Sequence, residues 1–242
     1  MIAMTTRKFA AFDIDGTIFR WQLYHQLVFD LARHGALPAS FEEQIAPYLE
    51  NWRRRSDSQA FASYELKLVT EFAKHLKGLS VAAVSESAAR VMAKSSSYVY
   101  TYTRDLLRSL KADGYVLIAL SGSFTQVVEP FAKQYNFDYW VGTDCESQGG
   151  LFTGEVTWNY DRKADNLALL IPAQGLGLAG SIAVGDTASD IPMLGLVETP
   201  IAFNPNRELF DHATSKGWAI VVERKNVVYR LAHHDGGYVL GT

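Results

Sequence analysis

The chain has 242 residues, of which 48% are hydrophobic and 20% are charged, and its formal net charge is -3 at pH 7. This composition is typical of a globular protein, and the slightly acidic balance disfavours binding to nucleic acid or to a membrane surface. We therefore expect no nucleic-acid and no membrane partner, and either one large domain or a core domain with a smaller one.

The location predicted from the sequence is the cytoplasm. Cys145 is the single cysteine, so no internal disulfide can form, as is usual in a reducing compartment. The first residues, MIAMTTRKFAAFDIDGT, contain no long apolar stretch before the first acidic residues, which argues against a signal peptide or a membrane anchor. No apolar run approaches the ~20 residues that a bilayer-spanning helix needs.

Short apolar runs predict buried strands, and helical patterns separate most of them. The expected strands are residues 8–12, 115–120, 181–184, 200–203 and 218–222. The expected helices between them are residues 103–111, 124–135 and 161–171. This alternation predicts an α/β fold with a doubly wound parallel sheet. Ligands of such sheets bind beyond the carboxyl ends of the strands, where the strand order switches.

Residues 19–97 interrupt the alternation. Amphipathic patterns predict helices at residues 21–34, 61–77 and 81–94, so we expect a helical insertion after the first strand. The expected division is a core of residues 1–18 and 98–242 with an inserted helical domain of residues 19–97. Gly149-Gly150, followed by LFTGEV, predicts a β-hairpin. His233-His234-Asp235 is expected to lie in a solvated tail rather than at a metal site.

Two acids, Asp13 and Asp15, follow the first expected strand. Alone, such a pair is as often a set of solvated surface acids as a functional site. If both converge on one ligand, they suit phosphoryl transfer, because one carboxylate can attack phosphorus while the other moves a proton to or from the leaving oxygen. Gly16 then allows the backbone to turn sharply beside the phosphate.

Three further features follow later strands. Ser121-Gly122 is expected at a helix start, where a hydroxyl and free N–H groups bind anions, although a serine there is more often a helix cap. Lys163, early in the next helix, could offset phosphoryl charge, although such a lysine is more often solvated. Asp186 and Asp190, together with Asp13, offer the hard oxygen ligands that Mg²⁺ prefers.

In the order DIDGT, SGS, a lone lysine and GDTASD, these motifs resemble the haloacid dehalogenase superfamily. The resemblance covers about residues 8–18 and 98–222. Within the superfamily, SGSFTQVVEPFAKQY, LFTGEV and YDRKADNL are similar to the phosphoserine-phosphatase-like branch. That branch has a Rossmann-like core and a helical cap between its first and second motifs, so the resemblance implies that the insertion is the cap.

The resemblance implies catalytic roles for three residues. Asp13 would be the nucleophile and a metal ligand. Asp15 would be the general acid and base, and would bind the metal through its backbone carbonyl. Lys163 would stabilise the charge on the transferred group.

The resemblance also implies the binding residues. Thr17 would orient the nucleophile, and Ser121 with the N–H of Gly122 would hold phosphate. Asp186 would ligate Mg²⁺, and Asp190 would support the metal site directly or through water.

One departure concerns the substrate. Phosphoserine phosphatases carry a glutamate shortly after the first motif that recognises the substrate's ammonium group, whereas this chain has Gln22 near that position and no acid before Asp30. A neutral amide pairs poorly with an ammonium group, which disfavours phosphoserine itself as the substrate.

The sequence therefore predicts a magnesium-dependent phosphatase that acts on a small phosphorylated metabolite. The alternative is a phosphotransferase that passes the phosphoryl group from the same intermediate to an alcohol. A dehalogenase is less favoured, since carbon–halogen cleavage has no leaving oxygen for Asp15 to protonate. A receiver domain is disfavoured because its acceptor acid would stand at Ser121. The sequence makes no prediction of the oligomeric state.

Overall fold

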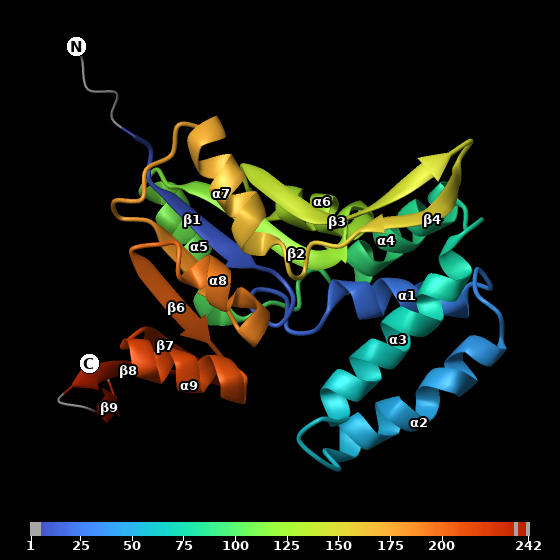
Figure 1. The fold of residues 1–242 in the computed structure, drawn as a ribbon, viewed down its shortest axis with the longest axis horizontal. Helices are drawn as coiled ribbons and strands as arrows, with labels where there is room; N and C mark the ends of the chain where they lie inside the picture. Colours follow the sequence, from blue (N-terminus) through green and yellow to red (C-terminus); the bar gives the residue numbers. More distant parts are fainter. Residues whose placement is uncertain (1–5, 235–236, 241–242) are drawn as a thin grey trace.

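The computed structural model describes residues 6–234 and 237–240. In this part of the chain the strands form one nine-stranded sheet in the order β4-β3-β2-β1-β5-β6-β7-β8-β9 (Figure 1). The strands are β1 (Phe9–Asp13), β2 (Val116–Phe124), β3 (Tyr139–Gln148), β4 (Leu151–Thr157), β5 (Ile182–Gly185), β6 (Thr199–Phe203), β7 (Ala219–Arg224), β8 (Val227–His234) and β9 (Gly237–Leu240).

The central strands, β3 to β7 in the sheet order, pair in parallel, and β4, β8 and β9 add antiparallel edges. β1 lies between β2 and β5, so the chain builds one half of the sheet outward from β1 and then returns to build the other half. The strand order therefore reverses at β1. The predicted doubly wound parallel sheet is confirmed, and its switch point lies where Asp13 ends β1.

Helices cover both faces of the sheet. The core helices are α5 (Thr101–Ala112), α6 (Thr125–Gln134), α7 (Lys163–Ala173), α8 (Ile191–Leu194) and α9 (Arg207–Lys216), with a 3₁₀ turn, η1, at Ala188–Asp190. Because side chains alternate along a strand, Ala10 and Phe12 of β1 pack into the core shared with α5 and α6. Phe9 and Ala11 pack into the opposite core, shared with α7, α8 and α9.

Four helices form the insertion between β1 and β2 (Figure 1). They are α1 (Leu23–Arg33), α2 (Ser40–Arg54), α3 (Ala60–Leu76) and α4 (Val81–Ser95). The sequence predicted α1, α3 and α4 but not α2. Pro47 stands inside α2, and proline usually ends a helix because it lacks an N–H group and its ring clashes with the preceding turn. Phe72 of α3 packs against Phe124, so the insertion shares its core with one face of the sheet.

One predicted boundary changes and one predicted turn is confirmed. β2 does not end at Leu120 but continues to Phe124, with a register shift against β3 between these two residues. The hairpin prediction is confirmed: Gly149 and Gly150 join β3 to β4 with positive φ values of 60° and 82°, as a tight two-residue turn requires.

The C-terminal segment is a strand pair rather than the expected tail. His233 and His234 lie on β8, which pairs with β9, and their side chains are exposed. Asp235 lies outside the described residues. None of the helices in the described part of the chain combines the length and the apolar character needed to cross a bilayer.

Candidate active site

The loop after β1 holds the first motif in a tight turn. The Ile14 carbonyl accepts the N–H of Phe19 at 2.9 Å, and the Gly16 N–H donates to the carbonyls of Phe19 and Trp21 at 2.9 and 3.1 Å. Gly16 has φ of 89°, a conformation that residues with a side chain rarely adopt. The turn places Asp13 and Asp15 at the carboxyl end of the sheet, as the sequence predicted.

Lys163 joins two of the predicted acids. Its ammonium nitrogen donates to Oδ1 of Asp13 at 2.6 Å and to Oδ1 of Asp190 at 2.7 Å, and all three side chains are buried. Burial by itself lowers the pKa of Lys163, but the charges of the two carboxylates outweigh this effect and raise the pKa overall. The lysine is therefore charged and clamps the end of β1 and the turn η1 to the start of α7.

Three carboxylates gather around one point. Asp13, Asp186 and Asp190 each offer an oxygen, and these oxygens lie within 4.8 Å of one another. Asp190 is fixed from within its own turn, because its Oδ2 accepts the N–H groups of Asp186 and Thr187 at 3.1 and 3.0 Å. Among the described residues, Oδ2 of Asp13 is buried and has no hydrogen-bond partner.

The charge balance of this cluster favours a cation. Burial raises the pKa of Asp13 to about 7, and burial with the charges of Asp13 and Asp190 raises the pKa of Asp186 well above its ordinary value. One ammonium group faces three acids, so a further positive charge would stabilise their ionised forms. The donors are all carboxylate oxygens and one is unpartnered, so the residues present fit Mg²⁺.

Asp15 is held by three donors from two other segments. Its Oδ1 accepts the N–H of Leu23 at the start of α1 at 2.5 Å. Its Oδ2 accepts the hydroxyls of Ser121 and Ser123 at 2.6 and 2.8 Å. Burial raises the pKa of Asp15, although these hydrogen bonds oppose the rise. The carboxyl group is thereby oriented and biased toward its protonated form, which suits a proton donor.

The predicted helix start at Ser121-Gly122 is wrong. Both residues lie within β2, and α6 begins only at Thr125. The strand continues because its pairing with β3 resumes at Phe124 after the register shift. The Ser121 hydroxyl donates to Asp15 and accepts the N–H of Ser123 at 2.9 Å, so in this structure it positions the acid.

Thr17 and Gly122 complete the predicted set. The Thr17 hydroxyl donates to Oδ1 of Asp186 at 3.2 Å, and its carbonyl accepts the hydroxyl of Thr103 at 2.9 Å. Gly122 lies against Tyr160, whose Cβ would be 3.0 Å from a Cβ at this position. Gly122 therefore leaves room for Tyr160 beside Ser121.

The predicted residues form two linked groups. Asp13, Thr17, Lys163, Asp186 and Asp190 make up the group around the acidic cluster. Asp15 and Ser121 make up the second group, and the tight loop from Asp13 to Asp15 joins it to the first.

The sequence did not identify Asn159. This buried residue donates from Nδ2 to the carbonyls of Ser121 and Val141 at 2.9 and 3.1 Å, and its Oδ1 accepts from Asn166 at 2.5 Å. It ties β2 to β3 and to α7. A lone asparagine in a loop carries no local signal of such a role.

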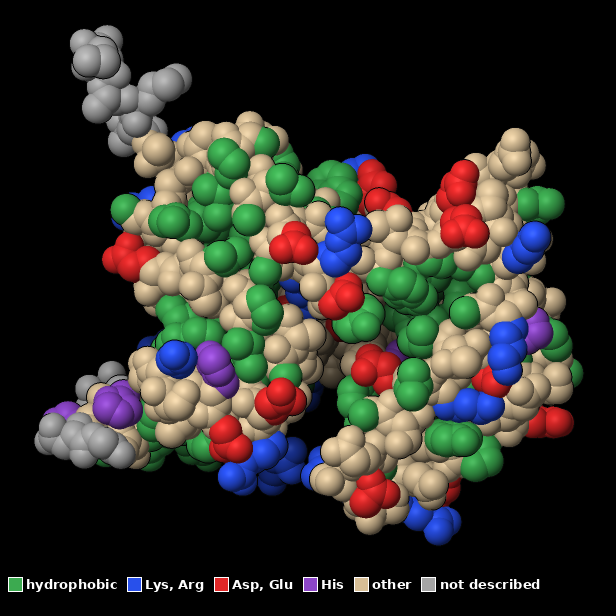
Figure 2. Space-filling view, viewed as in Figure 1, with side chains coloured by type: hydrophobic (Ala, Val, Ile, Leu, Met, Phe, Trp, Pro, Cys, Tyr) green, Lys and Arg blue, Asp and Glu red, His purple; other side chains and the backbone are tan. Residues whose placement is uncertain are grey.

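The sequence also missed Glu65, on α3 of the insertion. A side-chain hydrogen bond joins it to Gln22, and the charges of Asp15 and Lys163 both influence its pKa, so it lies within electrostatic reach of the site. Figure 2 shows the surface hollowed between the part of the molecule that carries α7, α8 and α9 and the part that carries α2 and α3.

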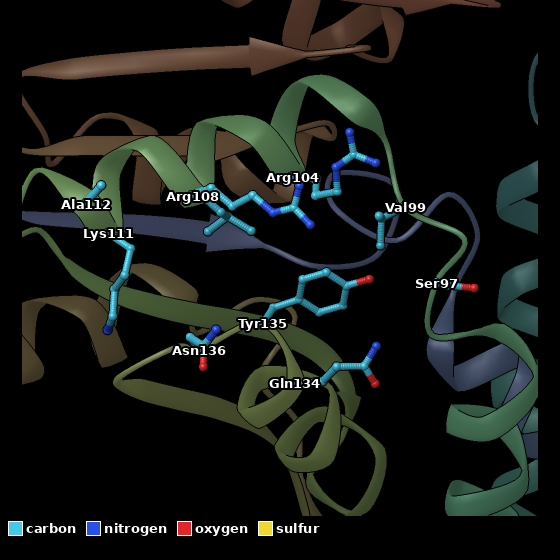
Figure 3. A pocket seen from close by; sticks show the side chains of 10 residues that line it. Ser97, Val99, Arg104, Arg108, Lys111, Ala112, Gln134, Tyr135 and Asn136 are labelled. Carbon is cyan, nitrogen blue, oxygen red and sulfur yellow. The ribbon is translucent and has the colours of Figure 1, made fainter.

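A separate pocket of about 590 Å³ lies between α5 and α6 (Figure 3). Arg104 and Arg108 line it, but both pair with Asp105, at 2.8 and 3.6 Å. Lys111, at its other end, pairs with Asp138 at 2.7 Å. These basic groups are already neutralised, and none of the predicted site residues lines the pocket.

The fold and the site define an α/β protein with an acidic, lysine-bridged centre at the switch point of its sheet. Residues 10–195 match the haloacid dehalogenase-like hydrolase family. The chain belongs to this family.

Individual relatives agree with this assignment. The chain is 28% identical over 220 residues to phosphoserine phosphatase SerB2 of Mycobacterium tuberculosis, an alignment that covers 88% of the chain and 49% of the relative. Across the curated relatives compared, the alignments cover between 25% and 55% of the relative's length.

Two solved structures share the fold. A Bordetella pertussis protein of unknown function is 24% identical with a TM-score of 0.71, and the match covers 89% of this chain and 98% of that one. A phospho-aspartyl intermediate analogue of phosphoserine phosphatase is 21% identical with a TM-score of 0.61, over 91% of this chain and 95% of that one.

Proposed function

We propose that the protein is a magnesium-dependent phosphatase that hydrolyses small phosphomonoesters through an aspartyl-phosphate on Asp13. One observation carries the proposal. Asp13 is buried with one oxygen fixed by Lys163 and the other without a partner among the described residues, two positions before an acid with a raised pKa. A fixed carboxylate with one free oxygen beside a proton donor is what phosphoryl transfer to a carboxylate requires.

In the first step, Oδ2 of Asp13 attacks phosphorus and the bond between phosphorus and the ester oxygen breaks. Protonated Asp15 gives its proton to the leaving oxygen, which departs as an alcohol. Lys163 remains beside Asp13 and offsets negative charge on the transferred group. The hydroxyl of Ser123 holds Asp15 in place during this step, while that of Ser121 is released to the phosphate.

In the second step, ionised Asp15 removes a proton from water, and the resulting oxygen attacks the phosphorus of phospho-Asp13. The bond between phosphorus and the Asp13 oxygen breaks. Asp13 is restored as a carboxylate, Asp15 is protonated again, and inorganic phosphate is released. The same side chain thus acts as acid and then as base.

Asp13, Asp186 and Asp190, with the backbone carbonyl of Asp15, would hold Mg²⁺. When bound there, the ion would neutralise negative charge on the phosphoryl oxygens and favour the ionised carboxylates. Thr17 would orient Asp186 through the hydrogen bond between their side chains. Ser121 and the N–H of Gly122 would bind phosphate once the substrate enters.

The insertion supports a small substrate. We propose that residues 19–97 act as a cap over a core of residues 1–18 and 98–242, because α1 begins with an N–H bonded to Asp15 and α3 places Glu65 within electrostatic reach of the site. A cap excludes bulk water around the intermediate and restricts entry to small molecules. Relatives and fold neighbours named as phosphoserine phosphatases support this substrate class.

The test is the Asp13→Asn variant, assayed with p-nitrophenyl phosphate and a panel of phosphorylated metabolites in the presence of Mg²⁺. Turnover should fall at least about a thousandfold while the fold persists, since the amide cannot act as the nucleophile. Asp165→Asn, at an exposed acid on α7, is the matched control and should keep the parent rate. Parent-rate hydrolysis by Asp13→Asn would show that the nucleophile is wrongly assigned.

The alternative, a phosphotransferase, gives different products from the same intermediate. With an added alcohol acceptor, a hydrolase releases inorganic phosphate, whereas a transferase places the phosphoryl group on the acceptor. Product analysis with and without the acceptor distinguishes the two.

A further inference from the structure

Residues 121–123 lie in a bulge of β2, between two stretches of regular pairing. β2 pairs with β1 as far as Leu120, and with β3 at Leu120 and then again at Phe124. Between these two pairs β2 advances four residues while β3 advances only two, from Val141 to Thr143. The carbonyl groups of the bulge therefore need partners other than the regular ladder of the sheet.

Two side chains supply these partners. Asn159 donates from Nδ2 to the carbonyl of Ser121 at 2.9 Å and to that of Val141 at 3.1 Å. The Thr143 hydroxyl donates to the carbonyl of Gly122 at 2.8 Å and accepts the N–H of Asn159 at 3.2 Å. Both side chains are buried, so their hydrogen bonds are shielded from water and strengthened by the low local dielectric.

Asn159 is itself fixed from a third direction. Its Oδ1 accepts a hydrogen bond from the side-chain amide of Asn166, which lies one turn after Lys163 on α7. Because the carbonyls on the other side of Asn159 can only accept, its amide group has a single orientation that satisfies all three bonds. The side chain thus couples the bulge of β2 to the helix that carries Lys163.

The bond to Asn159 sets the direction of the next N–H group along β2. The peptide that joins Ser121 to Gly122 is trans, so its carbonyl and its N–H point in opposite directions. Since Asn159 holds the carbonyl, the N–H of Gly122 points away from Asn159. Ser121 also donates its hydroxyl to Asp15, so this peptide adjoins the proposed reaction centre.

We propose that Asn159 is a positioning residue that directs the N–H of Gly122 at the phosphoryl group by holding the carbonyl of Ser121. The inference rests on the proposed function, in which this N–H binds phosphate. Thr143 supports the arrangement by holding the next carbonyl along the bulge. A donor that is fixed in advance stabilises the charge of the transition state, whereas a peptide free to rotate would turn its N–H away for part of the time.

The first experiment measures Asn159→Ala with p-nitrophenyl phosphate as the substrate and inorganic phosphate as a competitive inhibitor, in the presence of Mg²⁺. The value of kcat/KM should fall about 10- to 100-fold, as expected when a charged hydrogen bond in a buried site is weakened. The inhibition constant of phosphate should rise at least about fivefold. A loss of folded protein lowers the apparent kcat but leaves the inhibition constant of the remaining native molecules unchanged.

Tyr139→Phe is the matched control, because it also removes a buried tie between β3 and α7. The Tyr139 hydroxyl donates to Oε1 of Gln174, the residue that caps the far end of α7, at 2.7 Å. This hydrogen bond has no contact with the bulge of β2. The variant should therefore keep kcat/KM and the inhibition constant of phosphate within about twofold of the parent values.

A second pair of variants tests the same idea if Asn159→Ala does not fold. Thr143→Val keeps the size of the side chain but removes the hydroxyl that holds the carbonyl of Gly122. It should raise the inhibition constant of phosphate at least about threefold. Thr143→Ser retains the hydroxyl and should return the constant to within about twofold of the parent value.

The outcomes distinguish the role of Asn159 from the proposed function. If folded Asn159→Ala keeps the parent inhibition constant, or if Tyr139→Phe raises it as much, the role of Asn159 is wrong while the phosphatase activity stands. Where Asn159→Ala does not fold, equal constants for Thr143→Val and Thr143→Ser overturn the role. If the parent hydrolyses neither p-nitrophenyl phosphate nor any member of the metabolite panel, the proposed function fails and the role of Asn159 fails with it.

Discussion

Gly16 lies against the carboxylate of Asp186, with no room for a side chain between them. A Cβ at Gly16 would be 2.9 Å from Cγ of Asp186 and closer still to Oδ2. The turn after β1 and the acid after β5 therefore occupy adjoining space, and only the absence of a Cβ allows it. This contact links the first motif to the last across most of the chain.

Gly16→Ala should lower activity by at least about tenfold, because the new methyl group displaces an acid that is proposed to bind the metal. Gly78→Ala is the matched control: Gly78 also has a positive φ, of 83°, but nothing lies within 4 Å of the position of its Cβ. Both variants should lose about 1–2 kcal/mol of stability from the backbone conformation. Steady-state kinetics measure the activities, and urea unfolding measures the stabilities. Equal activities for the two variants would contradict the proposed displacement of Asp186.

Lys163→Met should lower the free energy of unfolding by about 3–5 kcal/mol, because it leaves buried carboxylates without their positive partner. Lys133→Met removes an ion pair of the same type to Glu129, but that pair is exposed on α6, with 61% and 42% of its two side chains accessible. Loss of this exposed ion pair should lower the free energy of unfolding by at most about 1 kcal/mol. Urea unfolding without metal measures the free energy of unfolding of both variants. If both substitutions lower it by a similarly small amount, Lys163 is not a structural clamp.

Mg²⁺ should stabilise the parent protein and be required for its activity. A ligand at 100 times its Kd adds about 2.7 kcal/mol to the free energy of unfolding. Asp186→Asn should remove this stabilisation, whereas Asp165→Asn on the exposed face of α7 should retain it. Thermal unfolding across a magnesium titration measures the effect. Full activity in excess EDTA would remove Mg²⁺ from the mechanism.

His25 should make the protein less stable as the pH falls. Burial lowers the pKa of its imidazole to about 3, from an ordinary 6.5, and among the described residues its Nε2 has no hydrogen-bond partner. Below the ordinary pKa the unfolded chain takes up a proton at this position and the folded protein does not, so protonation favours unfolding. The stability contributed by neutral His25 is therefore present above about pH 6.5 and is lost progressively toward pH 3.

His25→Phe isolates this effect, because an aromatic ring still packs against Tyr64 and Phe61. Between pH 7.5 and pH 5, the parent should lose about 2 kcal/mol more than the variant in free energy of unfolding. Any packing change is the same at both pH values and cancels in the comparison. Parallel pH dependences would show that His25 is not held neutral.

The architecture could be predicted because its signals are local. The apolar run that becomes β1, the acid at its end and the helical period of α5 or α6 are each encoded by neighbouring residues. The order of the motifs then placed Asp13, Lys163 and Asp186 at one edge of the sheet. Local signals failed at α2, where Pro47 breaks the helical pattern although packing against α3 maintains the helix.

The sequence by itself determined the doubly wound sheet, the strand ends that carry the acids and the helical insertion after β1. Only the tertiary structure decided that Ser121 donates to Asp15, that Asn159 ties β2 to β3 and that Glu65 lies within electrostatic reach of Asp15. The physical reason is that strands and helices follow from neighbouring residues, whereas the partner of a buried polar side chain depends on which distant segment the fold brings beside it.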